Sequence, residues 1–414
     1  MKISKSTLRP VLPWLICAVF AMLLIAAGRS ESKGRYLFGV LKADPTHRKT
    51  DYAAGIRLAE IGIHWDLYEP RRGEFDTEYR DRMMKEIEEY KRAGYEISVA
   101  TATQYTPQWV KADPALQHWS QFLGDTSGMA NLVFNGPLRS EAARFIADVV
   151  AHAGLVNYYR VGLSHHGETV YPVAKRGEWW AMDPMAQGDI PGRPSTILDP
   201  PFKHWVPGMP LENRQATQGE LLRWWSWYFD ALVDAHDWEI HSIRAAGFRG
   251  PVQVVVPGPA IRPLELQRRL QNGLAFDVND QYHLMNVGAV WYLFLDRLRE
   301  RQNLMIDISS VYDNSGQPRG NGCEPGDDKV DYLHDPEVEK WSSTRWISFN
   351  ARRNGFPTIG ENPGSDDENA MQNAVRLMEQ CQLTGLQWAF DDELYDGKHA
   401  TIDEYAKHIQ MANH

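Results

Sequence analysis

The regular alternation of short apolar runs with amphipathic helical patterns limits most strongly how this chain can fold. Eight runs of strand length follow one another from residue 36 onward. They are 36–41, 56–65, 95–103, 157–164, 252–258, 304–312, 356–360 and 383–390. Strands that alternate with helices form a parallel sheet with the helices outside, and eight of them close into a (β/α)8 barrel, also called a TIM barrel. The predicted fold class is therefore α/β with this barrel.

The helical segments between the runs have recognisable ends. One opens at Asp76 and stops at Gly94, with apolar residues spaced along one face. Another starts at Thr217 with Glu220 three residues later, which is the spacing of a capping box. The structural alternative, an open doubly wound sheet, is weakened because no glycine-rich phosphate loop follows any of the runs.

Residues 171–210 are rich in Pro, Gly and Trp and show no clear periodicity. Such a stretch is too long for a plain connection, and in a barrel it is a loop insertion after the fourth strand, above the face where active sites are built. A linker between two domains is the alternative. We favour the insertion and predict one barrel domain over residues 35–414.

Residues 1–34 read as a targeting segment. Lys2, Lys5 and Arg9 precede the apolar run "VLPWLICAVFAMLLIAAG", and "RSESKG" then turns polar. This pattern predicts either a cleaved signal peptide or a single membrane anchor. The protein is therefore expected to be secreted, periplasmic or anchored to the outer face of the cytoplasmic membrane, with any membrane contact made through this segment only.

Composition excludes several functions. The net charge is −10 and no basic stripe is present, which argues against a nucleic-acid partner. No Cys-x-x-Cys pair or zinc-type spacing occurs, so neither a metal nor another cofactor is predicted. Cys323 and Cys381 could pair in an oxidising compartment, but two cysteines are no disulfide framework. The sequence carries no indication of oligomeric state.

Two glutamates follow strand-like runs at corresponding places. Glu168 follows the fourth run within "YRVGLSHHGETVYP", and Glu361 follows the seventh within "PTIGENPG". In a barrel both would project onto the same face. Glycoside hydrolysis requires two carboxyl groups on either side of the sugar bond, one to donate a proton and the other to attack carbon or activate water. The pair therefore predicts a hydrolase of O-glycosyl bonds, although for either glutamate alone a surface or cap residue is the favoured reading.

The order of these motifs resembles the clan of (β/α)8 glycoside hydrolases whose acid/base and nucleophile glutamates follow strands four and seven. "HWDLYEPRRGEFD" (64–76) is similar to the clan's segment after strand two. "TATQYTPQWV" (101–110) is similar to the segment after strand three in the β-galactosidase-like families. The resemblance implies that Glu168 is the acid/base and Glu361 the nucleophile of a retaining enzyme. It also implies that Trp388 floors the sugar site and that Tyr312 steadies the nucleophile.

One motif departs from the clan's pattern. Gly167 precedes Glu168, where the clan has Asn, and "GETVYP" instead resembles the stretch around the catalytic acid of β-amylases, which are inverting (β/α)8 enzymes. Retaining chemistry is favoured by the motif order, and inverting chemistry is the alternative. A carbohydrate-binding barrel that has lost its chemistry is the rival from another class.

The remaining candidates bind the carbohydrate substrate or hold the catalytic pair. Histidines beside Glu168 are expected to bind sugar hydroxyls or to position that carboxyl, and the alternative is a metal site. The tryptophans of the long loop are expected to stack on sugar rings. The full set of predicted substrate-binding residues is Asp66, Gln104, Tyr105, His165, His166, Trp179, Trp180, Trp205, Asp307, Tyr312, Asn362, Trp388 and Asp391.

Overall fold

The computed structural model describes residues 35–275, 280, 283–312, 321–362, 369–398 and 400–414. Its centre is a closed barrel of eight parallel strands, arranged around the barrel in their order along the chain. The strands are β1 (Leu37–Val40), β2 (Leu58–His64), β3 (Glu96–Ala102), β6 (Tyr158–Val161), β7 (Val252–Val256), β8 (Leu304–Ile308), β9 (Thr358–Asn362) and β10 (Gly385–Trp388). Each overlaps one of the eight predicted runs, so the predicted barrel is confirmed.

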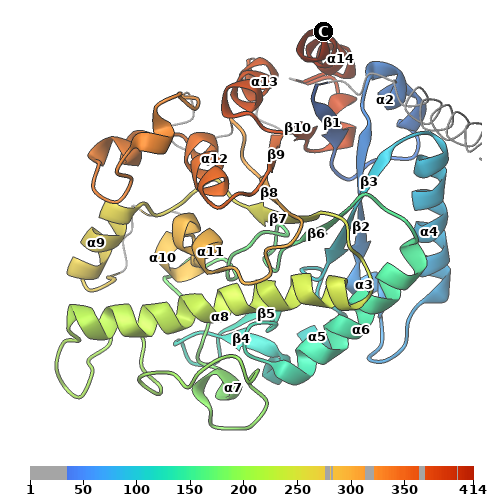
Figure 1. Ribbon diagram of the computed structural model, residues 1–414. Coiled ribbons are helices and arrows are strands. Elements are labelled where there is room, and N and C mark those ends of the chain that lie inside the picture. The colour runs from blue at the N-terminus through green and yellow to red at the C-terminus, as the bar shows by residue number, and fades with distance from the viewer. Residues whose placement is uncertain (1–34, 276–279, 281–282, 313–320, 363–368, 399) are drawn as a thin grey trace, which may run out of the picture.

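Helices surround the barrel, as Figure 1 shows. The longer ones are α2 (Arg48–Ala54), α4 (Thr77–Arg92), α6 (Gly136–Ala153), α8 (Gln218–Ala245), α9 (Pro263–Gln271), α11 (Trp291–Arg297), α12 (Ser343–Arg353), α13 (Ala370–Cys381) and α14 (Ile402–Asn413). The short ones are α3 (Trp65–Tyr68), α5 (Gln108–Lys111), α7 (Pro184–Gln187), α10 (Leu284–Val287) and the 3-10 turns η1 (Pro114–Leu116), η2 (Asp327–Lys329), η3 (Pro336–Lys340) and η4 (Asp391–Leu394). A small antiparallel hairpin, β4 (Gln117–Trp119) and β5 (Thr126–Ala130), follows β3 and was not predicted.

Side-chain caps place the helices where the sequence predicts them. The Asp76 carboxylate accepts the backbone N–H of Tyr79 at the start of α4. Thr217 and Glu220 form the expected capping box at the start of α8. Such caps satisfy N–H groups that the first helical turn leaves without partners. The predicted helix bounds are confirmed to within two residues at these two starts.

The inside of the barrel changes from apolar to charged along the strands. Leu58, Met305 and Ile359 pack together as an apolar plug. Because side chains on one face of a strand recur every two residues, the next inward positions are Glu60, Asp307 and Glu361. All three are buried. On each of these strands the charged group therefore lies one inward step beyond the plug residue. The levels are staggered between strands, since Asp307 on β8 is the register partner of Ile359 on β9.

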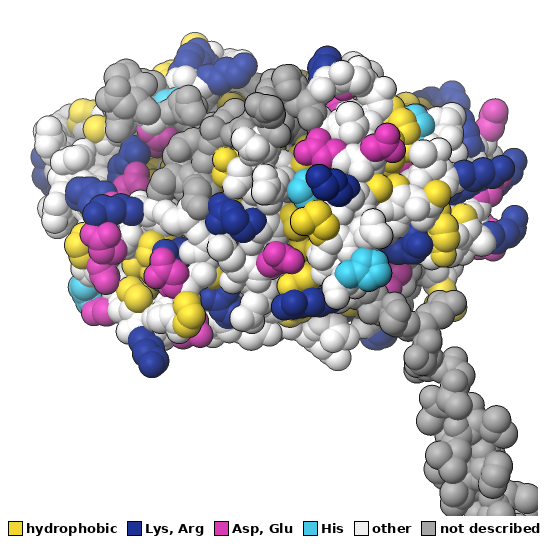
Figure 2. All heavy atoms as spheres, turned by 90° about the horizontal axis from the view of Figure 1, so that it is seen from above, with side chains coloured by type: hydrophobic (Ala, Val, Ile, Leu, Met, Phe, Trp, Pro, Cys, Tyr) yellow, Lys and Arg dark blue, Asp and Glu magenta, His cyan; other side chains and the backbone are white. Residues whose placement is uncertain are grey.

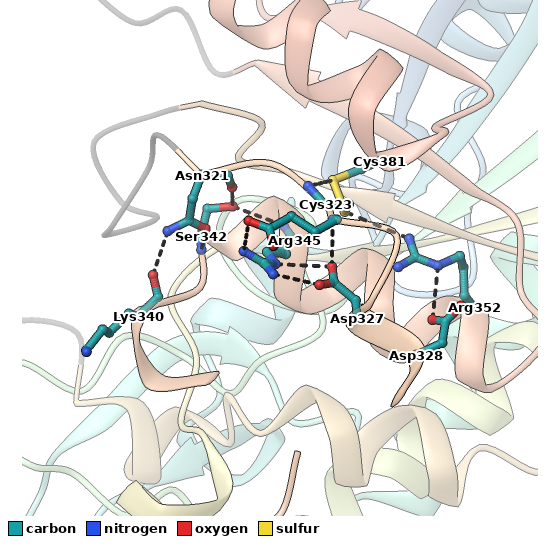
Figure 3. A network of polar contacts seen from close by, with 10 residues as sticks. Asn321, Cys323, Asp327, Asp328, Lys340, Ser342, Arg345, Arg352 and Cys381 are labelled. Carbon is teal, nitrogen blue, oxygen red and sulfur yellow. Dashed lines mark hydrogen bonds and ion pairs between the residues drawn. A yellow bond between two sulfur atoms is a disulfide. The ribbon is translucent and has the colours of Figure 1, made fainter. Parts of the chain in front are cut away.

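The connection from β8 to α12 is fastened by polar contacts and a disulfide. Cys323 and Cys381 are bonded, which joins this connection to α13. Arg345 donates to both carboxylate oxygens of Asp327, at 2.6 and 3.1 Å. Figure 3 shows this ion pair beside the disulfide. The cysteine pairing that the sequence left open is therefore made in the folded chain.

The predicted targeting segment, residues 1–34, lies outside the described residues. In the stretches that the structure does describe, no helix combines the length and apolar character needed to cross a membrane.

Candidate active site

A cavity of about 890 Å³ opens at the carboxyl ends of the barrel strands. Both Glu168 and Glu361 line it. Glu361 is part of β9, the seventh barrel strand, and Glu168 lies seven residues beyond the end of β6, the fourth. The structure thus brings together the two carboxyl groups that the sequence singled out, although they are 193 positions apart in the chain.

Glu361 is held by an arginine from the barrel interior. Its carboxylate Oε2 accepts a 2.6 Å hydrogen bond from Nη2 of Arg160, which belongs to β6. Only 6% of Glu361 is exposed. Among the described residues, the side-chain partner of this carboxylate is Arg160 and not Tyr312, so the tyrosine role implied by the resemblance is not seen. A charge-assisted hydrogen bond of this kind fixes the orientation of the acceptor.

Three carboxyl groups surround the single guanidinium of Arg160. Besides Glu361, Asp307 Oδ2 accepts a 3.0 Å hydrogen bond from Arg160 Nη1, and Glu60 is buried close by. Burial raises the pKa of Asp307 to about 7; Arg160 opposes this shift, while Glu361 and Glu60 add to it. Burial likewise raises the pKa of Glu60. The three acids outnumber the charge of Arg160, so Asp307 changes its protonation state near neutral pH.

Glu168 is presented by a tight loop after β6. Its backbone carbonyl accepts the N–H groups of Leu163 and Ser164, at 2.9 and 3.1 Å, which folds the loop back on the strand end. Gly162 makes this possible, because a Cβ there would lie 1.8 Å from the carbonyl oxygen of Gly167. Oε1 of Glu168 accepts a 2.6 Å hydrogen bond from the Ser309 hydroxyl, just beyond β8.

Four other predicted residues lie on the cavity wall. They are Gln104, Tyr105, His165 and His166. The Tyr105 ring is stacked on the imidazole of His64, with centroids 3.6 Å apart and planes 8° from parallel. His64 also lines the cavity. The stacked pair offers a rigid aromatic surface of the kind that binds a sugar face.

The remaining polar candidates have structural positions. Asp307 lies below the cavity wall, against Arg160. Asn362 is fully buried and its amide donates to the carbonyls of Val311 and Tyr312, at 2.7 and 3.2 Å. Asp391 is buried and accepts the backbone N–H of Asp44 at 2.5 Å. These residues are absent from the described cavity lining, as are Asp66 and Tyr312. Their assignment as direct sugar contacts is therefore not supported.

The tryptophans expected to stack on sugar belong to the core instead. Trp179 is 2% exposed and packs edge-on against Trp224 and Tyr228 of α8, at 5.1 and 5.4 Å. The other two, Trp180 and Trp205, are buried as well. The sugar-stacking prediction for these three residues is wrong, because α8 is long and aromatic and the loop after β6 covers it.

Trp388 is also turned away from the cavity. It is 1% exposed and lies 6.1 Å from the ring of Tyr405 on α14, outside the barrel. Its neighbour Gln387 points inward, where it donates to Asp307 at 3.3 Å. The aromatic ring that lines the cavity after β10 is Phe390, with the Lys42 ammonium 4.0 Å from its centroid. The prediction that Trp388 floors the site is wrong by two positions.

Sequence reasoning missed several residues of the site. Arg160 and Glu60 carried a usable signal, since each is a charged residue inside an apolar strand, where charge is normally paired or functional. Ser309, His64 and Phe390 carried none. No group of three or more His, Cys, Asp or Glu side chains within the described ranges is arranged to hold a metal ion.

Comparisons with known proteins agree with this architecture. Residues 47–118 match the sequence model of a glycoside hydrolase family described as β-galactosidase. The match spans both segments after strands two and three on which the β-galactosidase-like resemblance rests. A comparison with curated proteins gives no match.

Solved structures share the barrel. The catalytic domain of β-amylase from Paenibacillus polymyxa superposes with a TM-score of 0.62 at 12% identity, over 92% of this chain and 99% of that one. β-Galactosidases from the Antarctic haloarchaeon Halorubrum lacusprofundi and from Marinomonas ef1 give TM-scores of 0.53 and 0.54 at 15% and 13% identity, each over 91% of this chain. The chain spans only 57% and 59% of those two proteins. At these identities the likeness establishes the fold.

Proposed function

We propose that this protein is a glycoside hydrolase that cleaves an oligo- or polysaccharide with Glu168 and Glu361. The observation that carries the proposal is the convergence of these two carboxyl groups, from the fourth and seventh strands, on one cavity at the carboxyl face of the barrel. The partial match to the β-galactosidase family and the shared fold of a β-amylase and two β-galactosidases support it.

The favoured mechanism retains the configuration of the anomeric carbon. The Glu361 carboxylate, oriented by Arg160, attacks the anomeric carbon while Glu168 gives its proton to the leaving glycosidic oxygen. In the second step Glu168 takes a proton from water, the water oxygen attacks the same carbon, and Glu361 leaves as a carboxylate. Ser309 holds the Glu168 carboxyl through both proton transfers.

Inversion is the second candidate, favoured by the "GETVYP" stretch and by the superposition with β-amylase over nearly the full length of both chains. Here Glu361 would act as the base that deprotonates the attacking water. The two carboxyl groups are then about 6.5–9.5 Å apart, against about 5–5.5 Å in a retaining enzyme. The anomer formed first, followed by proton NMR during early hydrolysis, separates the two mechanisms.

The proposal is tested by sugar release from a panel of plant and bacterial polysaccharides. Glu168→Gln and Glu361→Gln should each reduce kcat by about 10²–10⁴-fold, because each removes one acid, base or nucleophilic group, while sugar binding persists. Binding without turnover in the unmodified protein would identify a carbohydrate-binding barrel instead. Glu379→Gln, at an exposed site on α13, is a matched control.

We also propose that the protein works outside the cytoplasm, with residues 1–34 as export signal or anchor. The Cys323–Cys381 disulfide supports this location, because structural disulfides persist mainly in oxidising compartments. Expression with a C-terminal tag, followed by fractionation and mass determination of the N-terminus, tests the location and shows whether the segment is cleaved.

A further inference from the structure

Lys175, His165 and His166 lie together on the cavity wall beside Glu168. We propose that this basic wall, made of Lys175, His165 and His166, binds an anionic substituent of the saccharide, a carboxylate or a sulfate, on a sugar next to the cleaved bond, with Lys175 supplying the positive charge. The inference rests on the proposed function and names the substrate class for the same site.

The basic side chains of this wall are not engaged in ion pairs. Among the described residues, Lys175, His165 and His166 form no ion pair with a carboxylate. The pKa of His165 is lowered, first by burial and then by the positive charges of His166, Lys175 and Lys111. The charged groups that lower this pKa are cations, and the lowered pKa leaves His165 as a neutral hydrogen-bonding group near pH 7. The catalytic candidate Glu168 is the carboxyl that shares the wall.

The nearest acids on the same loop are already engaged. Arg176, the residue after Lys175, forms ion pairs with Asp125 and with Glu178, each at 2.9 Å. Both carboxylates make their ion pairs with Arg176, and neither is paired with Lys175. On the face of the molecule shown in Figure 2, acidic and basic side chains are interspersed.

The rest of the cavity lining carries charge of both signs. Lys42 and Arg160 line it together with the acids Glu60, Glu86 and Glu361. Arg160 is paired with Glu361, and the charge of Lys42 acts on Glu60. The Lys175 ammonium forms no ion pair with a carboxylate of the described residues, so an anionic substituent can pair with it, whereas a neutral sugar gains nothing from this charge.

The net negative charge of the chain means that an anionic saccharide needs a local positive group in order to bind. The net charge of −10 repels an anion at long range. The solvent-accessible ammonium group of Lys175 supplies short-range attraction instead, and this attraction weakens as salt screens it. Lysine acts as a point charge, so the wall suits a carboxylate and a sulfate alike.

The test uses paired oligosaccharides with the same backbone. Neutral galacto-oligosaccharides are compared with oligogalacturonates and with sulfated galactan fragments, and neutral xylo-oligosaccharides with glucuronate-bearing ones. Binding is measured by calorimetry on the full-length Glu361→Gln variant, and hydrolysis on the unmodified protein. We expect the acidic member of at least one pair to bind roughly 10-fold or more tightly at low salt, and the advantage to shrink at 0.5 M NaCl. The acidic oligosaccharide that binds most tightly shows whether the substituent is a carboxylate or a sulfate.

Variants of Lys175 assign the preference to the wall. Lys175→Gln should reduce the ratio of acidic to neutral affinity roughly 5- to 30-fold, as expected for the loss of one charged hydrogen-bond donor. Lys175→Arg should keep it. Lys407→Gln, which removes an exposed charge on α14, should leave the ratio unchanged.

The two hypotheses fail differently. If neutral oligosaccharides are bound and hydrolysed as well as acidic ones, the anionic-substituent inference is wrong and the glycoside hydrolase stands. An acidic preference that Lys175→Gln leaves intact also overturns the inference. If no member of the panel is bound or hydrolysed, the proposed function fails and the inference fails with it.

Discussion

Arg160 Nη2 lies 2.6 Å from Oε2 of Glu361, and Nη1 of the same guanidinium lies 3.0 Å from Oδ2 of Asp307. One arginine inside the barrel therefore orients the proposed nucleophile and also neutralises part of a buried acidic cluster. Catalysis and stability are linked through this single side chain.

Removal of Arg160 should be strongly destabilising. Arg160→Gln leaves Asp307 and Glu361 without the guanidinium that pairs with them, and we expect the free energy of unfolding to fall by about 3–5 kcal/mol. Urea denaturation followed by circular dichroism measures the change. The double variant Arg160→Gln/Asp307→Asn should recover part of the loss, because one of the unpaired acids is gone. Strictly additive losses would show that the two groups do not interact.

Asp307 should give the activity a titration near neutral pH. Its pKa is raised to about 7, chiefly by burial, so the carboxyl is neutral below that pH and ionised above it. When Asp307 ionises, Arg160 pairs with two carboxylates instead of one, which weakens its hydrogen bond to Glu361. We therefore expect kcat/KM to decline as the pH rises through about 7. The Asp307→Asn profile should lack this inflection. An unchanged inflection in the variant would assign it to another group.

Gly162→Ala should remove activity while the barrel persists. A Cβ at this position would lie 1.8 Å from the carbonyl oxygen of Gly167, so the loop that presents Glu168 must move. We expect kcat to fall at least about 100-fold, since a displacement of about 1 Å in a catalytic group has that effect. Gly219→Ala is the matched control, because no atom lies within 4 Å of its added Cβ. Wild-type turnover in Gly162→Ala would mean that the loop adapts freely.

Glu239 on α8 should make stability depend on pH. Burial raises its pKa from 4.5 to about 8, and the nearby Gly162 N–H and Thr103 hydroxyl offset this only in part. Between about pH 4.5 and 8 the unfolded chain loses this proton and the folded chain keeps it. The free energy of unfolding therefore falls by about 1.4 kcal/mol per pH unit in that window.

The Glu239→Gln variant tests this dependence, because it is close in shape and does not ionise. The stability of the variant relative to the unmodified protein should rise from pH 4.5 to pH 8 and stay constant above it. Urea unfolding at pH 4.5, 6, 8 and 9 measures the difference. A difference that does not change with pH would show that Glu239 titrates alike in both states.

Loss of the Cys323–Cys381 bond should destabilise the chain. The two cysteines are 58 positions apart, and opening a loop of that size restores entropy to the unfolded state. Cys323→Ser/Cys381→Ser should lower the free energy of unfolding by about 2–4 kcal/mol. Dithiothreitol should lower the melting temperature of the unmodified protein and not that of the double variant.

The strands, the helices and the positions of both glutamates could be read from the sequence because each depends on local order. Periodicity identifies a strand or helix from its own residues, as at Asp76 and Thr217. A parallel barrel then places the carboxyl end of every strand on one face, so Glu168 and Glu361 could be predicted to meet without knowledge of any contact.

The surroundings of the tryptophans could not be predicted from local sequence patterns. Whether Trp388 faces the cavity depends on a single step of strand parity, which Gln387 settles by pointing inward to Asp307. The tryptophan side chain of Trp179 has an aromatic face and a polar N–H, which suit either a sugar ring or the packed side of α8. Residue type could not distinguish these environments, and the packing of distant elements decided them.

The sequence by itself thus determined the (β/α)8 topology, the face that carries the site and the pair of candidate carboxyl groups. Only the tertiary structure decided which side chains act on that pair. Arg160 reaches Glu361 across 201 positions, and Ser309 reaches Glu168 across 141. Such contacts arise when barrel closure brings strand ends together, and the burial that raises the pKa of Asp307 exists only in the closed barrel.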